Sequence, residues 1–244
     1  MPNQALPLQQ RQLETVLGVR WMIEAVLFDL DGTLLDRDAS IKRFIAAQYG
    51  RLGNYLSHIP KADYVSRFIE LDCHGHVWKD KVCQELVAEF GVRGLGWQAL
   101  LQDYETQFQA HCVPSPFLAE VLSELKQQGY LLGIVSNGLG TFQTRAIEGL
   151  KIQDYFEVIL ISEIEQVRKP QAEIFHRAMK QLGVTSIRSV FVGDYPEADI
   201  MGAKNAGMRA IWKRSLNWEE VKGADATITE LNEIPFVLQQ FESS

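Results

Sequence analysis

The chain has 244 residues, of which 46% are hydrophobic, and it carries a formal net charge of -7. This length and apolar content suffice for one large domain, or for a core domain with a smaller insert, without disulfides. The negative charge argues against a nucleic-acid partner, since such partners are normally bound by clustered lysines and arginines.

Neither a membrane span nor a secretory signal is indicated. No stretch reaches the roughly 20 apolar residues of a transmembrane helix, and residues 1–21 lack the apolar core of a signal peptide. The three cysteines are an odd number without CxxC spacing, which favours a reducing compartment. We therefore expect a cytoplasmic protein, a monomer or a homodimer, with residues 1–21 as an N-terminal extension. A short surface helix at residues 10–17 is the alternative for that segment.

The first strand is predicted at residues 23–30, where β-branched and aromatic residues follow one another as in a strand covered on both faces. It ends in Asp29-Leu30-Asp31-Gly32-Thr33. An unpaired carboxylate at the end of a buried strand costs several kcal/mol, so we expect a cation or hydrogen-bond donors around Asp29 and Asp31. Gly32 permits a sharp turn and a close approach of the backbone to a ligand.

Residues 38–112 show helical patterns and no convincing strand. Ser40 is expected to cap a helix at residues 41–49, and further helices are predicted at residues 63–71, 79–90 and 97–109. A crossover between parallel strands needs only one helix. We therefore predict a helical insert at residues 38–112, with residues 22–37 and 113–244 forming the core.

From Ser115 onward, helices and strands alternate. A helix is expected to start at Ser115-Pro116, and Gly183 should end another. The alternation predicts an α/β fold: a doubly wound parallel sheet that binds its ligands at the carboxyl ends of the strands. The further helices are predicted at residues 141–150, 172–182 and 199–206, and the strands at residues 130–135, 158–161, 189–192, 208–212 and 226–229.

Several of these strands end in polar residues, which a parallel sheet would bring to one edge. Asp29 and Asp31 follow the first strand, Ser136-Asn137 the second, and Gly193-Asp194 the fourth. Lys169-Pro170 lies in the loop before a helix, from which Lys169 can point inward.

Together these segments resemble the motifs of the haloacid dehalogenase (HAD) superfamily, in order, from residue 23 to about residue 230. The first motif is Asp29-Leu30-Asp31-Gly32-Thr33-Leu34 and the second is Val135-Ser136-Asn137. The third is Lys169-Pro170, and the fourth runs from Gly193-Asp194 through Asp199. The helical insert after the first motif resembles the cap of one subclass, which makes residues 38–112 the candidate cap domain and residues 22–37 and 113–244 the catalytic core. The resemblance implies a Rossmann-like core and the phosphatase branch of the superfamily.

The resemblance implies a Mg²⁺-dependent phosphomonoester hydrolase that acts on a small phosphorylated metabolite. Asp29 would be the nucleophile that forms an aspartyl-phosphate, Asp31 the general acid and base, and Lys169 a fixed positive charge beside the nucleophile. Mg²⁺ would be held by the carboxylates of Asp29 and Asp194 and by the backbone carbonyl of Asp31, with Asp199 supporting that set of ligands. The phosphate-binding residues would be Gly32, Thr33, Ser136 and Asn137.

Other functions remain open. A dehalogenase should not need the second acid, Asp31, because no leaving oxygen must be protonated. A sugar phosphomutase would use the same groups, and a catalytically silent binding protein would be favoured by the loss of a catalytic acid or of Lys169. The predicted cap has balanced charge, so it does not separate phosphoglycolate, sugar phosphates and nucleoside monophosphates. Cys73-His74-Gly75-His76 could bind a metal, contact the substrate or form a plain surface loop.

Overall fold

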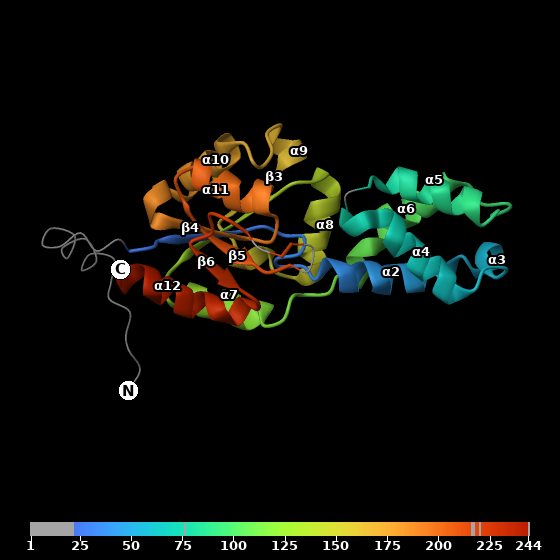
Figure 1. Cartoon of the computed structure of the whole chain (residues 1–244), viewed down its shortest axis with the longest axis horizontal. Helices are drawn as coiled ribbons and strands as arrows, with labels where there is room; N and C mark the ends of the chain where they lie inside the picture. The colour runs from blue at the N-terminus through green and yellow to red at the C-terminus, as the bar shows by residue number, and fades with distance from the viewer. Residues whose placement is uncertain (1–21, 76, 216–217, 220, 244) are drawn as a thin grey trace, which may run out of the picture. The chain divides into compact units, whose positions relative to one another are not determined.

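The structure is a computed structural model that describes residues 22–75, 77–215, 218–219 and 221–243. The expected N-terminal extension and His76 lie outside the described residues. The chain divides into two compact units (Figure 1). Described residues up to 34, together with 114–147 and 151 onward, form an α/β unit, and residues 35–113 with 148–150 form a helical unit.

The α/β unit is built on a six-stranded parallel sheet in the order β3-β2-β1-β4-β5-β6. Phe28 of β1 lies opposite Ile134 of β2 on one side and Val192 of β4 on the other. The strand order reverses at β1, and in such sheets ligands bind where the order reverses. The strands are β1 (Ala25–Phe28), β2 (Leu131–Ser136), β3 (Val158–Ile161), β4 (Ser189–Gly193), β5 (Arg209–Lys213) and β6 (Ala226–Ile228).

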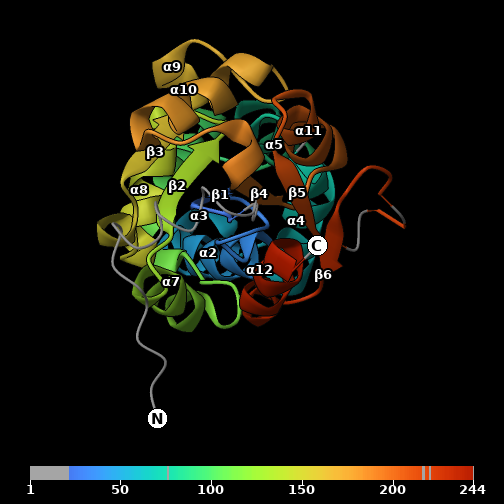
Figure 2. The same ribbon diagram turned by 90° about the vertical axis from the view of Figure 1, so that its left-hand side faces the viewer.

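Helices cover both faces of this sheet (Figure 2). On one face lie α10 (Ala172–Leu182) and α11 (Gly202–Asn205), and on the other α7 (Leu118–Gln127) and α12 (Ile234–Ser243). Two further helices follow strands, α8 (Gly140–Leu150) after β2 and α9 (Ser162–Glu165) after β3. The predicted fold class, a doubly wound parallel α/β sheet, is therefore confirmed. No helix among the described residues is both long and apolar enough to cross a lipid bilayer.

Helix α10 shows how sequence pattern becomes packing. Its residues Ile174, Phe175, Ala178 and Met179 recur at helical spacing and are all buried. Phe175 meets Phe191 of β4 edge to face, with ring centroids 5.0 Å apart. All residues of β1 and β4 are buried as well. The strands that lead to the site residues therefore lie inside the core.

Several details of this unit differ from the sequence prediction. Strand β1 spans Ala25–Phe28 rather than the predicted residues 23–30, and α9 was not predicted. Helix α7 begins at Leu118 rather than at Ser115-Pro116, because Phe117 takes a left-handed conformation (φ 62°) and the Ser115 hydroxyl donates to the carbonyl of Thr33 (2.7 Å). The segment predicted as a helix at residues 199–206 is a π-helix (Pro196–Met201) followed by α11. Helix α12 was not predicted. Its Pro235 stands in the first turn, where proline does not interrupt a helix.

The helical unit contains α2 (Arg37–Arg51), α3 (Gly53–Leu56), α4 (Lys61–Asp72), α5 (Lys79–Glu89) and α6 (Trp97–Gln107). The prediction that Ser40 caps the first of these helices is wrong. Asp36 is the cap, since its Oδ1 accepts a hydrogen bond from the amide of Ala39 at 3.0 Å. Ser40 lies inside the helix, where its hydroxyl donates to the carbonyl of Asp36 at 2.6 Å.

A buried ion pair joins three segments of the helical unit. The Asp72 carboxylate pairs with the Arg37 guanidinium (2.8 Å) and with the Lys79 ammonium, and it also accepts from the amide of Gly75 (3.0 Å). Burial by itself would raise the pKa of Asp72, but the hydrogen bonds and charges of Arg37 and Lys79 outweigh it and hold that pKa below its usual value. This acid is therefore ionised and paired in the folded unit.

The segment singled out for its cysteine and histidine follows α4. Cys73 is exposed and carries a free thiol, and Nδ1 of His74 lies 3.6 Å from a carboxylate oxygen of Asp38. Within the described part of the chain, neither residue belongs to a group of three potential metal-ligating side chains.

Candidate active site

The polar residues that follow β1, β2 and β4 are brought together at one edge of the sheet. The amide of Asp29 still donates to the carbonyl of Val192 on β4 (2.9 Å), so the backbone of Asp29 remains part of the sheet. Ser136 is the last residue of β2, and Asp194 directly follows β4. The side chain of Asp29 is therefore fixed at the point where the strand order reverses.

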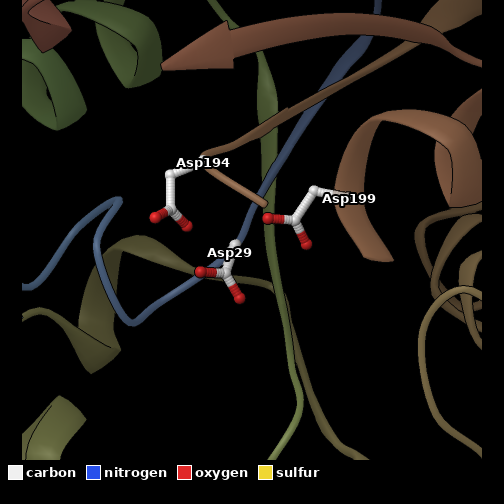
Figure 3. Close-up of side chains that lie close together, drawn as sticks. All are labelled: Asp29, Asp194 and Asp199. Carbon is white, nitrogen blue, oxygen red and sulfur yellow. The ribbon is translucent and has the colours of Figure 1, made fainter. Parts of the chain in front are cut away.

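Three carboxylates converge there, those of Asp29, Asp194 and Asp199 (Figure 3). Each offers one oxygen, and these oxygens all lie within 4.8 Å of one another. Asp29 and Asp199 are buried and Asp194 is partly buried. A donor set made only of carboxylate oxygens suits a hard cation such as Mg²⁺ or Ca²⁺ better than a soft one, so the residues present fit such an ion.

Burial and repulsion disfavour the charged forms of two of these acids, Asp29 and Asp194. Burial, followed by the charge of Asp199, raises the pKa of Asp194 to about 7. Burial also raises the pKa of Asp29 well above its usual value, with the charges of Asp199 and Asp194 adding to the effect of burial and the charge of Lys169 opposing it. Positive charge at this site therefore stabilises the ionised carboxylates.

Lys169 supplies one such charge from inside the protein. Its Nζ lies 2.5 Å from Oδ1 of Asp29 and 2.7 Å from Oδ1 of Asp199, and it faces the ring of Phe191 with 5.2 Å to the centroid. The side chain is 2% exposed. Burial lowers the pKa of Lys169, but the two carboxylates outweigh burial and raise that pKa above its usual value. The ammonium group is therefore charged.

The side chain of Asn137 holds the backbone of Lys169. Its Oδ1 accepts from the amide of Lys169 and its Nδ2 donates to the carbonyl of Lys169, both at 3.0 Å. The residue after β2 thus positions the loop that carries the lysine. The sequence placed Asn137 and Lys169 at one site without indicating that they bond to each other.

Two buried hydroxyl groups at the site have no hydrogen-bond partner among the described residues. They are Oγ of Ser136 and Oγ1 of Thr33. Buried hydroxyl groups are normally paired. The hydroxyl of Ser136, at the end of β2, is therefore suited to donate to a ligand.

Gly32 lets the loop after β1 approach Asp194. Its φ is +85°, and a Cβ atom at this position would lie 2.5 Å from Oδ2 of Asp194. Both the backbone conformation and the space therefore require glycine. The side chain of Asp31, in the same loop, lies outside the three-carboxylate group and accepts a hydrogen bond from Nε2 of Gln143 at 2.7 Å.

The sequence prediction missed Gln143 and two residues of β5. Nε1 of Trp212 donates to the carbonyl of Asp194 (2.9 Å), and Nζ of Lys213 donates to the carbonyl of Gly32 (2.8 Å). These two residues end a strand that pairs with β4, so the rule that strand ends share one edge could have found them. Gln143 lies on the buried face of α8 beside apolar residues, and no sequence pattern distinguishes it there.

The sequence that forms this sheet and its carboxylate–lysine site also matches a known protein family. A family model described as haloacid dehalogenase-like hydrolase matches residues 26–213. The chain belongs to this family and is a hydrolase with a Rossmann-like core.

Individual relatives are similar over almost the whole chain. A glyceraldehyde 3-phosphate phosphatase from Pyrococcus furiosus is 30% identical, covering 91% of this chain and 95% of its own length. The crystal structure of a HAD phosphatase from Thermococcus onnurineus is 29% identical with a TM-score of 0.63, covering 88% of this chain and 98% of its own. A 2-haloacid dehalogenase from Pseudomonas syringae pv. Tomato is 26% identical with a TM-score of 0.61, covering 90% of this chain and 100% of its own.

Proposed function

We propose that this hydrolase is a Mg²⁺-dependent phosphomonoesterase that acts on a small phosphorylated metabolite through an aspartyl-phosphate on Asp29. The observation that carries the proposal is the buried Asp29 carboxylate, 2.5 Å from the ammonium of Lys169 and beside two further carboxylates. The similarity to phosphatases from Pyrococcus furiosus and Thermococcus onnurineus supports it. Within this proposal, the helical unit is the cap domain that selects the substrate.

The metal would be held by the carboxylates of Asp29 and Asp194 and by the backbone carbonyl of Asp31, with Asp199 supporting this set. When bound, Mg²⁺ supplies positive charge that draws electron density from the phosphoryl oxygens and offsets the repulsion between the ester and the carboxylates. Asp199 also pairs with Lys169, so it orients the lysine as well.

In the first step, an Asp29 carboxylate oxygen bonds to phosphorus while the ester P–O bond breaks. The electron pair of that bond stays on the leaving oxygen, which takes the proton of the Asp31 carboxyl group and departs as an alcohol. In the second step, a water oxygen bonds to phosphorus and gives a proton to the Asp31 carboxylate. The P–O bond to Asp29 breaks, its electron pair returns to Asp29, and inorganic phosphate leaves.

The phosphoryl oxygens carry the negative charge that must be bound during both steps. The Ser136 hydroxyl, which is buried without a protein partner, donates to one of them. The side chain of Asn137 is occupied by Lys169, so Asn137 and Gly32 contribute through backbone N–H groups. The Lys169 ammonium stabilises the charge on the transferring group.

A 2-haloacid dehalogenase is also among the similar structures, so Asp31 decides between the two reactions. Halide leaves as an anion without protonation, whereas an alkoxide needs a proton, which makes a second acid beside the nucleophile useful only for the ester. The Asp31 side chain is not one of the three grouped carboxylates and accepts a hydrogen bond from Gln143, so in this proposal it remains free to carry a proton. The presence of Asp31 supports the proposal of phosphate chemistry.

The test is a phosphate-release panel with Mg²⁺ and with EDTA, run on glyceraldehyde 3-phosphate, phosphoglycolate, sugar phosphates and nucleoside monophosphates. Rearranged sugar phosphate is assayed alongside free phosphate, so that a mutase is detected. We expect Mg²⁺-dependent release that Asp29→Asn abolishes, whereas Asp154→Asn, the same change at an exposed position, leaves it intact. Release that persists in EDTA or in Asp29→Asn would refute the mechanism.

A further inference from the structure

The buried amide of Gln143 lies against the acid that the proposed mechanism uses to move protons. Nε2 of Gln143 is 2.7 Å from Oδ2 of Asp31 and 3.1 Å from the carbonyl oxygen of Asn137. The residue is 3% exposed. Both hydrogens of its amide NH₂ group are therefore used, one on the loop after β1 and one on the turn after β2.

We propose that Gln143 is a positioning residue for proton transfer by Asp31, and this inference rests on the proposed function. Asp31 stands in a loop and is only partly buried, so its carboxyl group would otherwise rotate about two bonds. A hydrogen bond to Oδ2 fixes the plane of the carboxyl group and leaves Oδ1 to carry the proton toward the leaving oxygen. Small errors in such an orientation are costly, since proton transfer needs heavy atoms within hydrogen-bond reach.

The placement of Gln143 depends on the glycine that follows Asn137. A Cβ atom at Gly138 would lie 2.5 Å from Nε2 of Gln143, closer than any ordinary contact. The amide of Gly138 in turn donates to the hydroxyl of Ser162 at 3.0 Å, which holds the turn in place. Helix α8, the turn after β2 and the loop after β1 therefore meet at this one side chain.

Glutamine suits the position because it donates hydrogen bonds without adding charge. Glutamate would place a like charge against Asp31, and methionine has a similar length but offers no donor. Gln143→Met therefore removes the tie to Asp31 while it keeps most of the volume. Comparing esters whose leaving groups do and do not need a proton then separates a role in proton delivery from a general loss of structure.

The experiment compares kcat/KM for two esters, p-nitrophenyl phosphate and the alkyl phosphate that the wild-type enzyme hydrolyses fastest. Nitrophenolate leaves without a proton, whereas the alkyl leaving oxygen needs the proton of Asp31. Because kcat/KM reports the steps through the first irreversible one, it isolates the transfer to Asp29. We expect Gln143→Met to lose roughly 10- to 100-fold on the alkyl ester and less than about threefold on the aryl ester.

Gly138→Ala provides a second variant that leaves the amide group of Gln143 in the chain. The added methyl group displaces the flexible end of Gln143, so we expect the same selective loss with little change in Tm. Ile147→Val, a change on the buried face of the same helix, is the control; it removes one buried methyl group and should affect both esters equally.

Equal losses on the two esters in Gln143→Met, or wild-type behaviour of Gly138→Ala, overturn the inference alone. A selective loss in Ile147→Val also overturns it, because the selectivity would then follow from any weakening of α8. A wild-type enzyme inactive on both esters would refute the proposed function and this inference with it.

Discussion

Replacing Lys169 by methionine removes the buried cation between Asp29 and Asp199, whose oxygens lie 2.5 and 2.7 Å from its ammonium group. Two buried carboxylates then lose their counter-charge in a site where burial, with the charges of Asp199 and Asp194, already raises the pKa of Asp29. Loss of one partner of a buried ion pair costs about 3–5 kcal/mol. We expect a loss of that size in the free energy of unfolding at pH 7, measured by urea denaturation in EDTA so that no metal ion replaces the lysine.

The control is Lys204→Met, which removes an exposed ion pair with Asp225 at 2.8 Å. Because exposed pairs contribute about 0–1 kcal/mol, the two variants should differ severalfold in unfolding free energy. A loss in Lys169→Met no larger than in Lys204→Met would refute the electrostatic account of the site.

The pH dependence of Lys169→Met follows from the same charges. Without the lysine, the pKa values of Asp29 and Asp194 in the folded protein lie further above those of the unfolded chain. The folded state therefore binds more protons than the unfolded state across that range, and stability rises as the pH falls toward the unfolded values near 4. Unfolding free energies measured between pH 5 and pH 8 should show the deficit of Lys169→Met shrinking at the acidic end, and a deficit independent of pH would contradict this expectation.

Three further predictions concern single side chains. Ser136→Ala should lower kcat by roughly 10²-fold through loss of a phosphate donor while leaving Tm unchanged, because its hydroxyl has no partner among the described residues; a wild-type kcat would contradict this. Gly32→Ala should cost about 1–3 kcal/mol in urea unfolding, because it strains a φ of +85° and crowds Asp194. Asp72→Asn should destabilise the protein above pH 4, and the difference from wild type should vanish as the pH falls through the lowered pKa of Asp72; a constant difference down to pH 2 would exclude the ion pair as its cause.

The parts of the fold that the sequence predicted well are those where one strong pattern dominates. Strand β3 and helix α10 have the predicted bounds, because a short run of branched apolar residues and a 3.6-residue stripe ended by glycine leave few alternatives. The predicted start of α2 was wrong because Asp36 and Ser40 are both good capping residues and lie within one turn of each other. Only the tertiary contact between the Ser40 hydroxyl and the amide of Val113 (2.8 Å) shows why Ser40 lies inside the helix.

In the candidate site, too, sequence patterns predicted some features, whereas others depend on tertiary contacts. Asp29, Ser136 and Asp194 could be placed together because each ends a buried strand, and parallel strands bring their carboxyl ends to one edge. The bond between Asn137 and Lys169 and that between Gln143 and Asp31 join segments 32 and 112 residues apart in the chain. Such pairings depend on the packing of loops and helices over the edge, for which a single sequence carries no local signal.

The end of β5 gives the site a shared support. Trp212 and Lys213 are adjacent in sequence, yet one bonds to the carbonyl of Asp194 after β4 and the other to that of Gly32 after β1. Two loops that would otherwise fluctuate independently are therefore attached to a single strand end. Local opening of either loop is coupled to the other, so amide hydrogens in both should exchange with solvent as one cooperative unit. The ordered positions of Asp194 and of the loop that contains Gly32 are thus lost or regained together.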